Sequence, residues 1–448
     1  MNEIDNIFKA YDIRGKVGSE LTPLIVKNIG RALADWLPEK GIVAVGRDMR
    51  PDSEELSKAL IDGLILQGRD VLNIGQVTSD MIYFAVGKYN LAGGAVITAS
   101  HNPGEYNGIK LCREQAKPIG DQTGLFEIRD RVAKEKFSKV IKNGKTKDKD
   151  ISEEWVEHVL SFINVDKLKP LNIVVDAGNG MAGKIFPEIE PYIPFKIYEM
   201  YFELDGTFPN HIANPIDKEN LKDLIRTIKQ QKADAGVAFD GDGDRAVLVD
   251  EKGNILTGTV MTSMLANYFL SLHPGSTILH NAITGRVAPE TINSAGGNAI
   301  RTKVGHSNIK NDMRKHNAIF AGEHSGHYYF ADNYMADSGL IAAMVALTVL
   351  SNSKKRLSEL VNKYRKYHDI SETNFEVKDK QLTMKKVEES FKAATVDYLD
   401  GLTLTFNDGW INVRPSNTES LLRLNAEADS KTKLEQYVSK VTKIIENS

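Results

Sequence analysis

The sequence has little cysteine and no long apolar run. Its only cysteine, Cys112, excludes an intramolecular disulfide, fits a reducing compartment, and ends the apolar stretch 109–112 as a buried structural thiol would. No stretch approaches 18 uninterrupted apolar residues, and Met1–Asp5 has neither a basic nor an apolar leader pattern. We therefore expect a cytoplasmic protein without a membrane span.

The sequence also lacks a strong excess of one charge. Lys plus Arg is 57 and Asp plus Glu is 60, so the formal net charge is −3. This balance gives no overall argument for binding nucleic acid or an anionic membrane surface. Hydrophobic residues make up 41% of the 448 residues, which is enough for a globular protein of roughly three domains.

Helix and strand patterns alternate along the first part of the chain. We expect helices over 23–36, 53–67 and 81–89, and strands over 42–46, 71–74 and 95–97. Ser53 is the expected N-cap of the second helix. Such alternation predicts βαβ units and a mainly parallel sheet.

Similar patterns follow a polar, lysine-rich stretch, Lys134–Asp150, which we expect to be a solvated linker. One α/β pattern contains the expected helices and strands 152–162, 173–175, 218–231 and 235–239. Another contains 260–272, 277–279, 307–315, 319–321 and 338–350. After about residue 367 come short strands such as 410–413 and a helix over 431–446, which predicts a smaller α+β domain.

The most informative segment places Asp240, Asp242 and Asp244 at alternate positions around two glycines, after the apolar run 235–239. Carboxylates this close repel one another unless a cation lies among them, and oxygen ligands suit a hard divalent cation such as Mg²⁺. A calcium EF-hand is an alternative, and Glu251 falls at its twelfth position. However, Arg245 stands where that loop needs glycine, and the flanks resemble strands. A solvated acidic turn is the other alternative.

A second segment, Thr98–Lys110, follows the expected strand 95–97. Ligand sites in open α/β sheets lie beyond the carboxyl ends of strands. Ser100 is therefore a candidate hydroxyl nucleophile, with His101 adjacent and Lys110 close in sequence; an ordinary loop turn is the alternative. No Gly-x-Ser-x-Gly elbow is present, which argues against a hydrolase triad.

Two further polar turns are candidates for binding a ligand. Gly322–His327 offers Glu323 and Ser325 to sugar hydroxyls, whereas a zinc site at its histidines would need a helical His-Glu-x-x-His pattern that is absent. Arg414–Glu419 joins an arginine to small polar side chains that could surround a phosphate, or it could be a capped turn.

A dinucleotide site is a rival interpretation. Gly178–Gly183 matches G-x-G-x-x-G after the expected strand 173–175, and Glu199 lies about twenty residues further on. This short match does not account for the other polar segments.

Taken together and in this order, the segments resemble the motifs of the α-D-phosphohexomutase family over nearly the whole chain. Tyr11–Gly15 resembles its N-terminal motif, and Thr98–Pro103 its phosphoserine loop. The metal, sugar and phosphate loops of the family are similar to Asp240–Arg245, Gly322–His327 and Arg414–Thr418, respectively. The resemblance implies three related α/β domains with mixed or parallel sheets and a C-terminal α+β domain around a central cleft. We expect their bounds at 1–148, 149–253, 254–367 and 368–448.

Within the family, the Gly322–His327 turn and Asn417 resemble the phosphomannomutase/phosphoglucomutase members. A lysine that some members place near His280–Ala282 has no counterpart, and Lys303 is not a clear substitute. The resemblance implies a mutase that interconverts hexose 6-phosphate and hexose 1-phosphate, with mannose and glucose as the expected sugars. A phosphoglucosamine mutase and a non-catalytic phosphosugar-binding protein are the alternatives.

The resemblance also implies roles for individual residues. Ser100 would carry a phosphoryl group, hexose 1,6-bisphosphate would be the intermediate and activator, and one Mg²⁺ would lie between Ser100 and the three aspartates, Asp240, Asp242 and Asp244. The implied catalytic residues are Ser100, His101, Lys110, Arg14, Arg245 and His327. The implied substrate-binding residues are Tyr11, Lys303, His306, Glu323, Ser325, Arg414, Ser416, Asn417 and Thr418. Proton transfer by His101, His327 or Lys110 stays open. Phosphosugars are the expected partners, without nucleic acid, membrane or an obligate protein partner.

Overall fold

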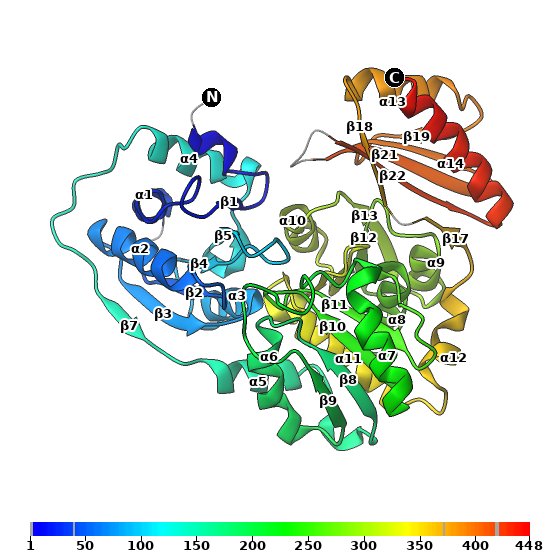
Figure 1. Ribbon diagram of the computed structural model, residues 1–448, viewed down its shortest axis with the longest axis horizontal. Helices are drawn as coiled ribbons and strands as arrows, with labels where there is room; N and C mark the ends of the chain where they lie inside the picture. Colours follow the sequence, from blue (N-terminus) through cyan, green and yellow to red (C-terminus); the bar gives the residue numbers. More distant parts are fainter. Residues whose placement is uncertain (1–2, 39–40, 371, 417–420) are drawn as a thin grey trace.

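The computed structural model describes residues 3–38, 41–370, 372–416 and 421–448. In this part of the chain the strands form four separate sheets, and each sheet comes from one contiguous stretch of sequence (Figure 1). We call the four stretches and their helices units one to four. No helix among the described residues combines the length and the apolar character needed to cross a bilayer.

Unit one contains a mixed sheet with the strand order β1-β5-β4-β2-β3-β7, and β6 pairs with β5. Its strands are β1 (Ile13–Lys16), β2 (Val43–Arg47), β3 (Val71–Gln76), β4 (Gly93–Ile97), β5 (Tyr106–Arg113), β6 (Lys117–Pro118) and β7 (Thr146–Asp148). Its helices are α1 (Pro23–Trp36), α2 (Ser53–Leu66), α3 (Ser79–Lys88) and α4 (Leu125–Ala133), with 3-10 turns η1 (Glu3–Asn6), η2 (Glu114–Ala116) and η3 (Asp121–Thr123). Because β5 runs antiparallel to both β1 and β4, the sheet is less parallel than the alternation of helices and strands predicted.

Two local predictions in unit one need correction. The expected linker 134–150 is mostly exposed, as predicted, but it contains β7, which pairs in parallel with β3 from Val71 opposite Thr146. This edge strand is exposed along its length, so it carries no apolar alternation that a sequence pattern could reveal. Helix α2 begins at Ser53 after Asp52, and the Ser53 hydroxyl donates to Asp48 Oδ1 at 2.5 Å instead of capping the helix.

Unit two has the strand order β11-β10-β8-β9. Its elements are α5 (Ser152–Leu160), η4 (Val165–Lys167), β8 (Asn172–Asp176), α6 (Ala182–Ile189), η5 (Glu190–Tyr192), β9 (Lys196–Met200), η6 (Lys218–Leu221), α7 (Lys222–Gln231), β10 (Ala235–Phe239) and β11 (Ala246–Asp250). Strands β10 and β11 form an antiparallel hairpin in which Phe239 lies opposite Ala246. The three aspartates therefore occupy the turn of a hairpin between strands, and the helical flanks of an EF-hand are absent.

Unit three has the strand order β13-β12-β14-β15-β16. Its elements are α8 (Gly258–Leu272), β12 (Thr277–Asn281), α9 (Val287–Ser294), β13 (Asn298–Thr302), α10 (His306–His316), β14 (Phe320–Gly322), β15 (Tyr328–Phe330), η7 (Ala331–Asn333), β16 (Ala336–Asp337), α11 (Gly339–Ser351), α12 (Leu357–Val361) and η8 (Asn362–Tyr364). Helix α11 is apolar nearly all round and packs against α8 of its own unit and against α5 and β11 of unit two. One buried apolar cluster accordingly extends through units one to three.

Unit four is an antiparallel sheet with the order β17-β22-β21-β20-β19, and β18 pairs with β22. Its elements are β17 (His368–Asp369), β18 (Thr373–Glu376), α13 (Lys380–Glu389), β19 (Thr395–Asp397), β20 (Leu402–Phe406), β21 (Gly409–Pro415), β22 (Leu421–Ala428) and α14 (Lys431–Glu446). Both helices lie on the outer side of the sheet, away from unit three (Figure 1), and they enclose a separate apolar core. The predicted class, three α/β domains and a C-terminal α+β domain, is confirmed.

Candidate active site

Ser100 lies directly after β4, at the carboxyl end of a central strand of unit one. Its backbone is in the left-handed region, with φ 51°, and the residue is 4% exposed. The Ser100 hydroxyl donates to Asp240 Oδ2 at 2.8 Å and lies 3.2 Å from His101 Nδ1. The turn thus directs the serine hydroxyl across to the aspartate hairpin of unit two.

The three aspartates of that hairpin are buried together. Asp240, Asp242 and Asp244 are at most 2% exposed, and one oxygen of each lies within 4.8 Å of the others. Burial and the two neighbouring carboxylates raise the pKa of Asp240 to about 7, although Arg245 opposes the shift. Asp242 Oδ1 accepts no hydrogen bond from the described residues, and Asp244 Oδ1 has His327 Nε2 at 3.5 Å. A buried group of carboxylate oxygens with so few donors fits a hard cation that takes oxygen ligands.

Two cations from the chain offset part of this negative charge. Lys110 Nζ lies 2.5 Å from both Asp242 Oδ2 and Asp244 Oδ2. Burial opposes the charge of Lys110, but the two carboxylates outweigh it and hold its pKa well above the ordinary value. Arg245 Nε lies 2.9 Å from Asp240 Oδ2, and its Nη2 is 3.5 Å from Ser100 Oγ.

Arg14 contacts the loop that carries Ser100. Its guanidinium donates to Asn102 Oδ1 at 2.5 Å and to Asp12 Oδ2 at 2.6 Å. Arg14 therefore lies beside the turn that follows Ser100, and its charge lowers the pKa of His101.

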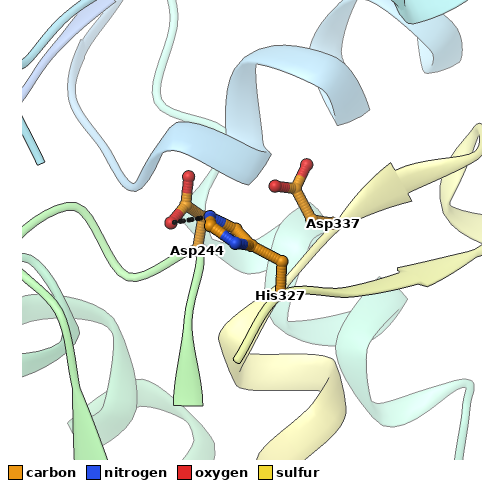
Figure 2. A group of neighbouring side chains, drawn as sticks. All are labelled: Asp244, His327 and Asp337. Carbon is orange, nitrogen blue, oxygen red and sulfur yellow. Dashed lines mark ion pairs between the residues drawn. The ribbon is translucent and has the colours of Figure 1, made fainter. Parts of the chain in front are cut away.

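The two histidines of the site differ in their surroundings. Burial, Arg245 and Arg14 hold the pKa of His101 well below its usual range, so its imidazole is neutral at pH 7. His327 projects between Asp244 and Asp337 (Figure 2), with Nε2 3.5 Å from Asp244 Oδ1. Burial opposes protonation of His327, but Asp244 outweighs it and raises the pKa. A neutral ring next to Ser100 can accept a proton, whereas His327 favours the charged form.

Asp244, His327 and Asp337 form a second group of potential metal ligands. Lys310, which is fully buried, lies with Nζ 2.7 Å from Asp337 Oδ1. The three aspartates of the hairpin offer only oxygen ligands, which a hard cation prefers, so they fit such a cation better than this mixed group does.

The side chains of the Gly322–His327 turn differ in their burial and hydrogen-bond partners. Glu323 is 2% exposed and accepts hydrogen bonds from Tyr329 Oη at 2.6 Å and the Gly305 amide at 3.2 Å. Ser325 Oγ lies 3.0 Å from His327 Nδ1. Burial lowers the pKa of His324, the other histidine of the zinc alternative.

The remaining predicted sugar-binding residues gather where units one, three and four approach. Tyr11 Oη donates to the Val304 carbonyl at 3.3 Å, and its ring meets that of His306 edge-on at 5.5 Å. A cavity of about 530 Å³ opens beside them and is lined by Tyr11, Lys303, Asn308, Asp121, Gln122 and Asp400, among others. Residues from three units therefore share one polar cavity.

The predicted phosphate-binding turn is described in part. Arg414 is 4% exposed, and its Nη2 donates to Glu372 Oε2 at 2.8 Å. The same carboxylate accepts from Arg423 Nη1 at 3.1 Å and Asn425 Nδ2 at 3.0 Å. Ser416 begins the turn and is buried, whereas Asn417 and Thr418 lie outside the described residues.

The G-x-G-x-x-G segment packs against the aspartate hairpin. The Met181 amide donates to the Gly241 carbonyl at 2.9 Å, and a Cβ on Gly180 would come within 2.8 Å of that oxygen. The absence of a side chain at Gly180 thus allows two backbone turns to touch. The Met181 amide, a donor that a pyrophosphate would use in the dinucleotide alternative, is therefore already bonded to the protein.

Two residues at the site had not been predicted. Ser79, at the start of α3, donates from Oγ to Asp242 Oδ2 at 2.5 Å. Arg50 donates to the carbonyl of Ser100 at 2.9 Å. Arg50 follows β2 at the sheet edge where Ser100 follows β4, so the shared position beyond neighbouring parallel strands was the available signal.

The fold and the site together define a four-unit α/β enzyme in which a hydroxyl nucleophile candidate faces a buried group of carboxylates that could hold a cation. The chain matches models described as phosphoglucomutase/phosphomannomutase alpha/beta/alpha domain I over residues 5–139, domain II over 153–253, domain III over 256–367 and the C-terminal domain over 372–444. The chain belongs to the phosphoglucomutase/phosphomannomutase family, the α-D-phosphohexomutases, as the motifs predicted. Membership places it among the phosphohexose mutases, which are isomerases.

Individual relatives are similar over nearly their full length. The chain is 40% identical to a phosphomannomutase of Vibrio cholerae over 453 residues, covering 98% of each chain. It is 40% identical over 423 residues to a protein of Xanthomonas campestris pv. campestris named phosphohexose mutases, covering 94% of each. A crystal structure of a phosphoglucomutase/phosphomannomutase family protein from Burkholderia thailandensis superposes with a TM-score of 0.92 at 31% identity, covering 100% of this chain and 98% of that one.

Proposed function

We propose that the protein interconverts hexose 6-phosphate and hexose 1-phosphate, with mannose and glucose phosphates as substrates, through a phosphoserine at Ser100. The observation that carries the proposal is the Ser100 hydroxyl, held in a left-handed turn 2.8 Å from a carboxylate of the buried aspartate hairpin. The names of the relatives support the same activity. We also propose the four domain bounds expected from the sequence, 1–148, 149–253, 254–367 and 368–448.

In the proposed reaction, the bond between phosphorus and Ser100 Oγ breaks as a new bond forms to the free hydroxyl of the hexose phosphate. The hydroxyl proton passes to a base, and Ser100 Oγ regains a proton. His101 is suited to this exchange because its neutral ring lies 3.2 Å from Oγ. The resulting hexose 1,6-bisphosphate reverses its orientation, and Ser100 then accepts the other phosphoryl group.

Charge around Ser100 suits phosphoryl transfer, which depends on positioning and on neutralising the transferred group. A phosphoserine adds nearly two negative charges, and Arg245, Lys110 and Arg14 offer positive charge on its different sides. Asp240, Asp242 and Asp244, with the phosphate on Ser100, would hold one Mg²⁺, which neutralises phosphate charge when bound. His327 is placed to donate a proton from the unit three side.

Substrate recognition is assigned to the turns of units three and four. Glu323 and Ser325 would bind sugar hydroxyls, and Arg414 and Ser416, with Asn417 and Thr418, would bind the non-reacting phosphate. Tyr11 and Lys303, which line the cavity of about 530 Å³, and His306, which contacts the Tyr11 ring, would bind the substrate from the side of that cavity. Phosphosugars are the proposed partners, and the single cysteine supports a cytoplasmic location.

The proposal is tested by intact mass and by assays with mannose, glucose and glucosamine phosphates. We expect wild-type protein to carry a phosphoryl group of about 80 Da on serine and to turn over the mannose and glucose substrates. Ser100→Ala should fold normally yet lose both properties, whereas Ser161→Ala, at an exposed serine after α5, should keep them. Normal steady-state turnover by Ser100→Ala would refute the assignment. Preference for glucosamine phosphate would favour the alternative mutase.

A further inference from the structure

Arg50 is a charged residue buried in the interior of unit one. It is 2% exposed and lies in the turn between β2 and α2. A buried charge needs partners for its donors, because an unpaired one would strongly destabilise the fold. Among the described residues, the hydrogen-bond and ion-pair partners of the guanidinium come from two places, the turn after β4 and the neighbouring Asp48.

The Arg50 guanidinium binds the backbone of the turn that carries Ser100. Nη1 donates to the carbonyls of Pro103 at 2.9 Å and Tyr106 at 2.8 Å. Nη2 donates to the carbonyls of Ser100 at 2.9 Å and Asn102 at 2.6 Å. Four carbonyls of one seven-residue turn thus converge on a single planar cation, whose fork of donors matches this arrangement.

The remaining nitrogen of Arg50 faces Asp48. Nε lies 3.4 Å from Asp48 Oδ2 in an ion pair without a hydrogen bond, and Asp48 Oδ1 accepts from the Arg50 amide at 3.0 Å. The guanidinium lies 5.1 Å from the centre of the Phe208 ring of unit two. A Cβ on Gly206 would come within 2.4 Å of Arg50 Cα, so unit two packs closely against the Arg50 backbone.

The turn needs such support because of its conformation. Ser100 has a positive φ, which is unfavourable for a residue with a side chain. The hydroxyl faces Asp240 only while this conformation lasts, and Arg50 binds the carbonyl of the same residue. Arg50 contacts Ser100 at its carbonyl, so it acts on the hydroxyl through the backbone.

We propose that Arg50 is a positioning residue for the Ser100 nucleophile, holding the turn so that Oγ stays aimed at the aspartate hairpin. This inference rests on the proposed function and deepens it. Arg50 makes its contacts to protein backbone and to Asp48, so it affects the rate of phosphoryl transfer and leaves binding of the sugar unchanged.

The test compares Arg50→Lys and Arg50→Met with the matched control Arg47→Met. Arg47 is the last residue of β2, and it pairs at 3.2 Å with Glu54, whose side chain is 81% exposed. We expect kcat per folded molecule to fall about 100-fold in Arg50→Met, the scale of a small misplacement of reacting groups. KM should change less than about threefold, which is within one kcal/mol, and the control should keep both constants.

Arg50→Lys keeps the charge but offers three donors at one nitrogen instead of a fork. Arg50→Lys should recover only part of the kcat that Arg50→Met loses. If Arg50→Met does not fold, Arg50→Lys alone tests the inference. A kcat equal to wild type in folded Arg50→Lys would overturn the inference. So would a loss that appears only in KM, or only in thermal stability.

Hydrogen exchange of the amides in the 98–108 segment tests the same contact without any assay of turnover. Faster exchange in Arg50→Lys than in Arg47→Met is expected, and unchanged exchange would contradict the inference. If wild-type protein shows no mutase activity, the proposed function fails, while this exchange measurement still decides whether Arg50 holds the turn.

Discussion

Lys110 shows how a single side chain balances the aspartate hairpin. Its ammonium lies 2.5 Å from both Asp242 and Asp244, and the residue is 8% exposed. Removing one partner of a buried ion pair leaves uncompensated charge and costs about 3–5 kcal/mol. Lys110→Met should therefore lower the thermal midpoint of the protein in chelator and abolish turnover.

A divalent cation should restore part of that stability, because it supplies the charge that the lysine no longer provides. The measurement is thermal unfolding with chelator and with added Mg²⁺, and the rise in midpoint should be larger in Lys110→Met than in wild type. The control is Lys117→Met, which breaks a partly exposed pair with Glu114 at 3.3 Å worth about 0–1 kcal/mol. Equal responses to Mg²⁺ in the two variants would contradict the prediction.

Asp80 gives the stability of the protein a pH dependence. It is fully buried at the start of α3, and burial raises its pKa to about 8. Hydrogen bonds from the hydroxyls of Ser338 and Thr78 oppose this shift. In the unfolded chain an aspartate titrates near ~3.9, so between pH ~4 and about 8 folding takes up a proton. Stability therefore falls as pH rises through this window, by about 1.4 kcal/mol per pH unit for this group.

Asp80→Asn should remove that contribution to the slope and gain stability relative to wild type toward pH 8. Urea unfolding at a series of pH values measures the effect. Asp62→Asn, at an exposed position of α2, is the control and should follow wild type. The same slope in Asp80→Asn as in wild type would show that Asp80 is ionised in the folded protein.

Among the helices and strands, α11 connects two units through apolar packing. Leu347 is fully buried in this helix, which packs against α5 and β11 of unit two. Leu347→Ala should lower the free energy of unfolding by about 2–5 kcal/mol, through lost transfer energy and the cavity left behind. The control is Leu382→Ala in α13, where the side chain is 50% exposed and the effect should stay within about 0.5 kcal/mol. Urea unfolding compares them, and similar losses in both variants would contradict the prediction.

Elements with strong local signals were predicted well from the sequence. Helix α1 has Thr22 as its cap and proline at its first turn, and β10 and α14 also have the predicted bounds. Strand β7 was missed because an exposed edge strand carries no apolar pattern. The four polar turns of the site were found because each follows an apolar strand.

The partners of those turns could not be predicted, because they lie far away in the sequence. Arg50 and Ser100, Ser79 and Asp242, and Glu372 and Arg414 meet only through tertiary packing. The different charge states favoured at His101 and His327 depend on the same packing, so sequence alone left the proton-transfer residue open.

At the scale of the whole molecule, unit four is attached differently from the others. Units one to three share a buried apolar cluster, whereas unit four encloses its own. Its described contacts with unit three include the ion pairs of Arg286 with Glu427 at 2.8 Å and with Asp429 at 2.7 Å. A polar contact of this kind favours relative motion of domains, and the proposed phosphate-binding residue Arg414 belongs to the unit that would move.

Glu372 lies at the start of unit four, and its carboxylate pairs with arginines that a substrate phosphate would need. Its carboxylate accepts from Arg414 at 2.8 Å and Arg423 at 3.1 Å, and its side chain is 23% exposed. An incoming phosphate must therefore compete with Glu372 for these donors, and the net contribution of a hydrogen bond is about 1 kcal/mol. Glu372→Gln should bind inorganic phosphate about fivefold more tightly than wild type, since 1.4 kcal/mol is tenfold in affinity.

Isothermal titration calorimetry with inorganic phosphate measures this change, and KM for the hexose phosphate should fall in parallel. Glu376→Gln, an exposed glutamate of β18 in the same segment, removes one charge without touching either arginine and is the matched control. Weaker binding in Glu372→Gln would show instead that the carboxylate orients Arg414 for the phosphate. In that case Arg414 would keep its contact with Glu372 while it binds the substrate phosphate. Tighter binding would mean instead that the phosphate replaces the Glu372 carboxylate as the partner of Arg414 when unit four moves.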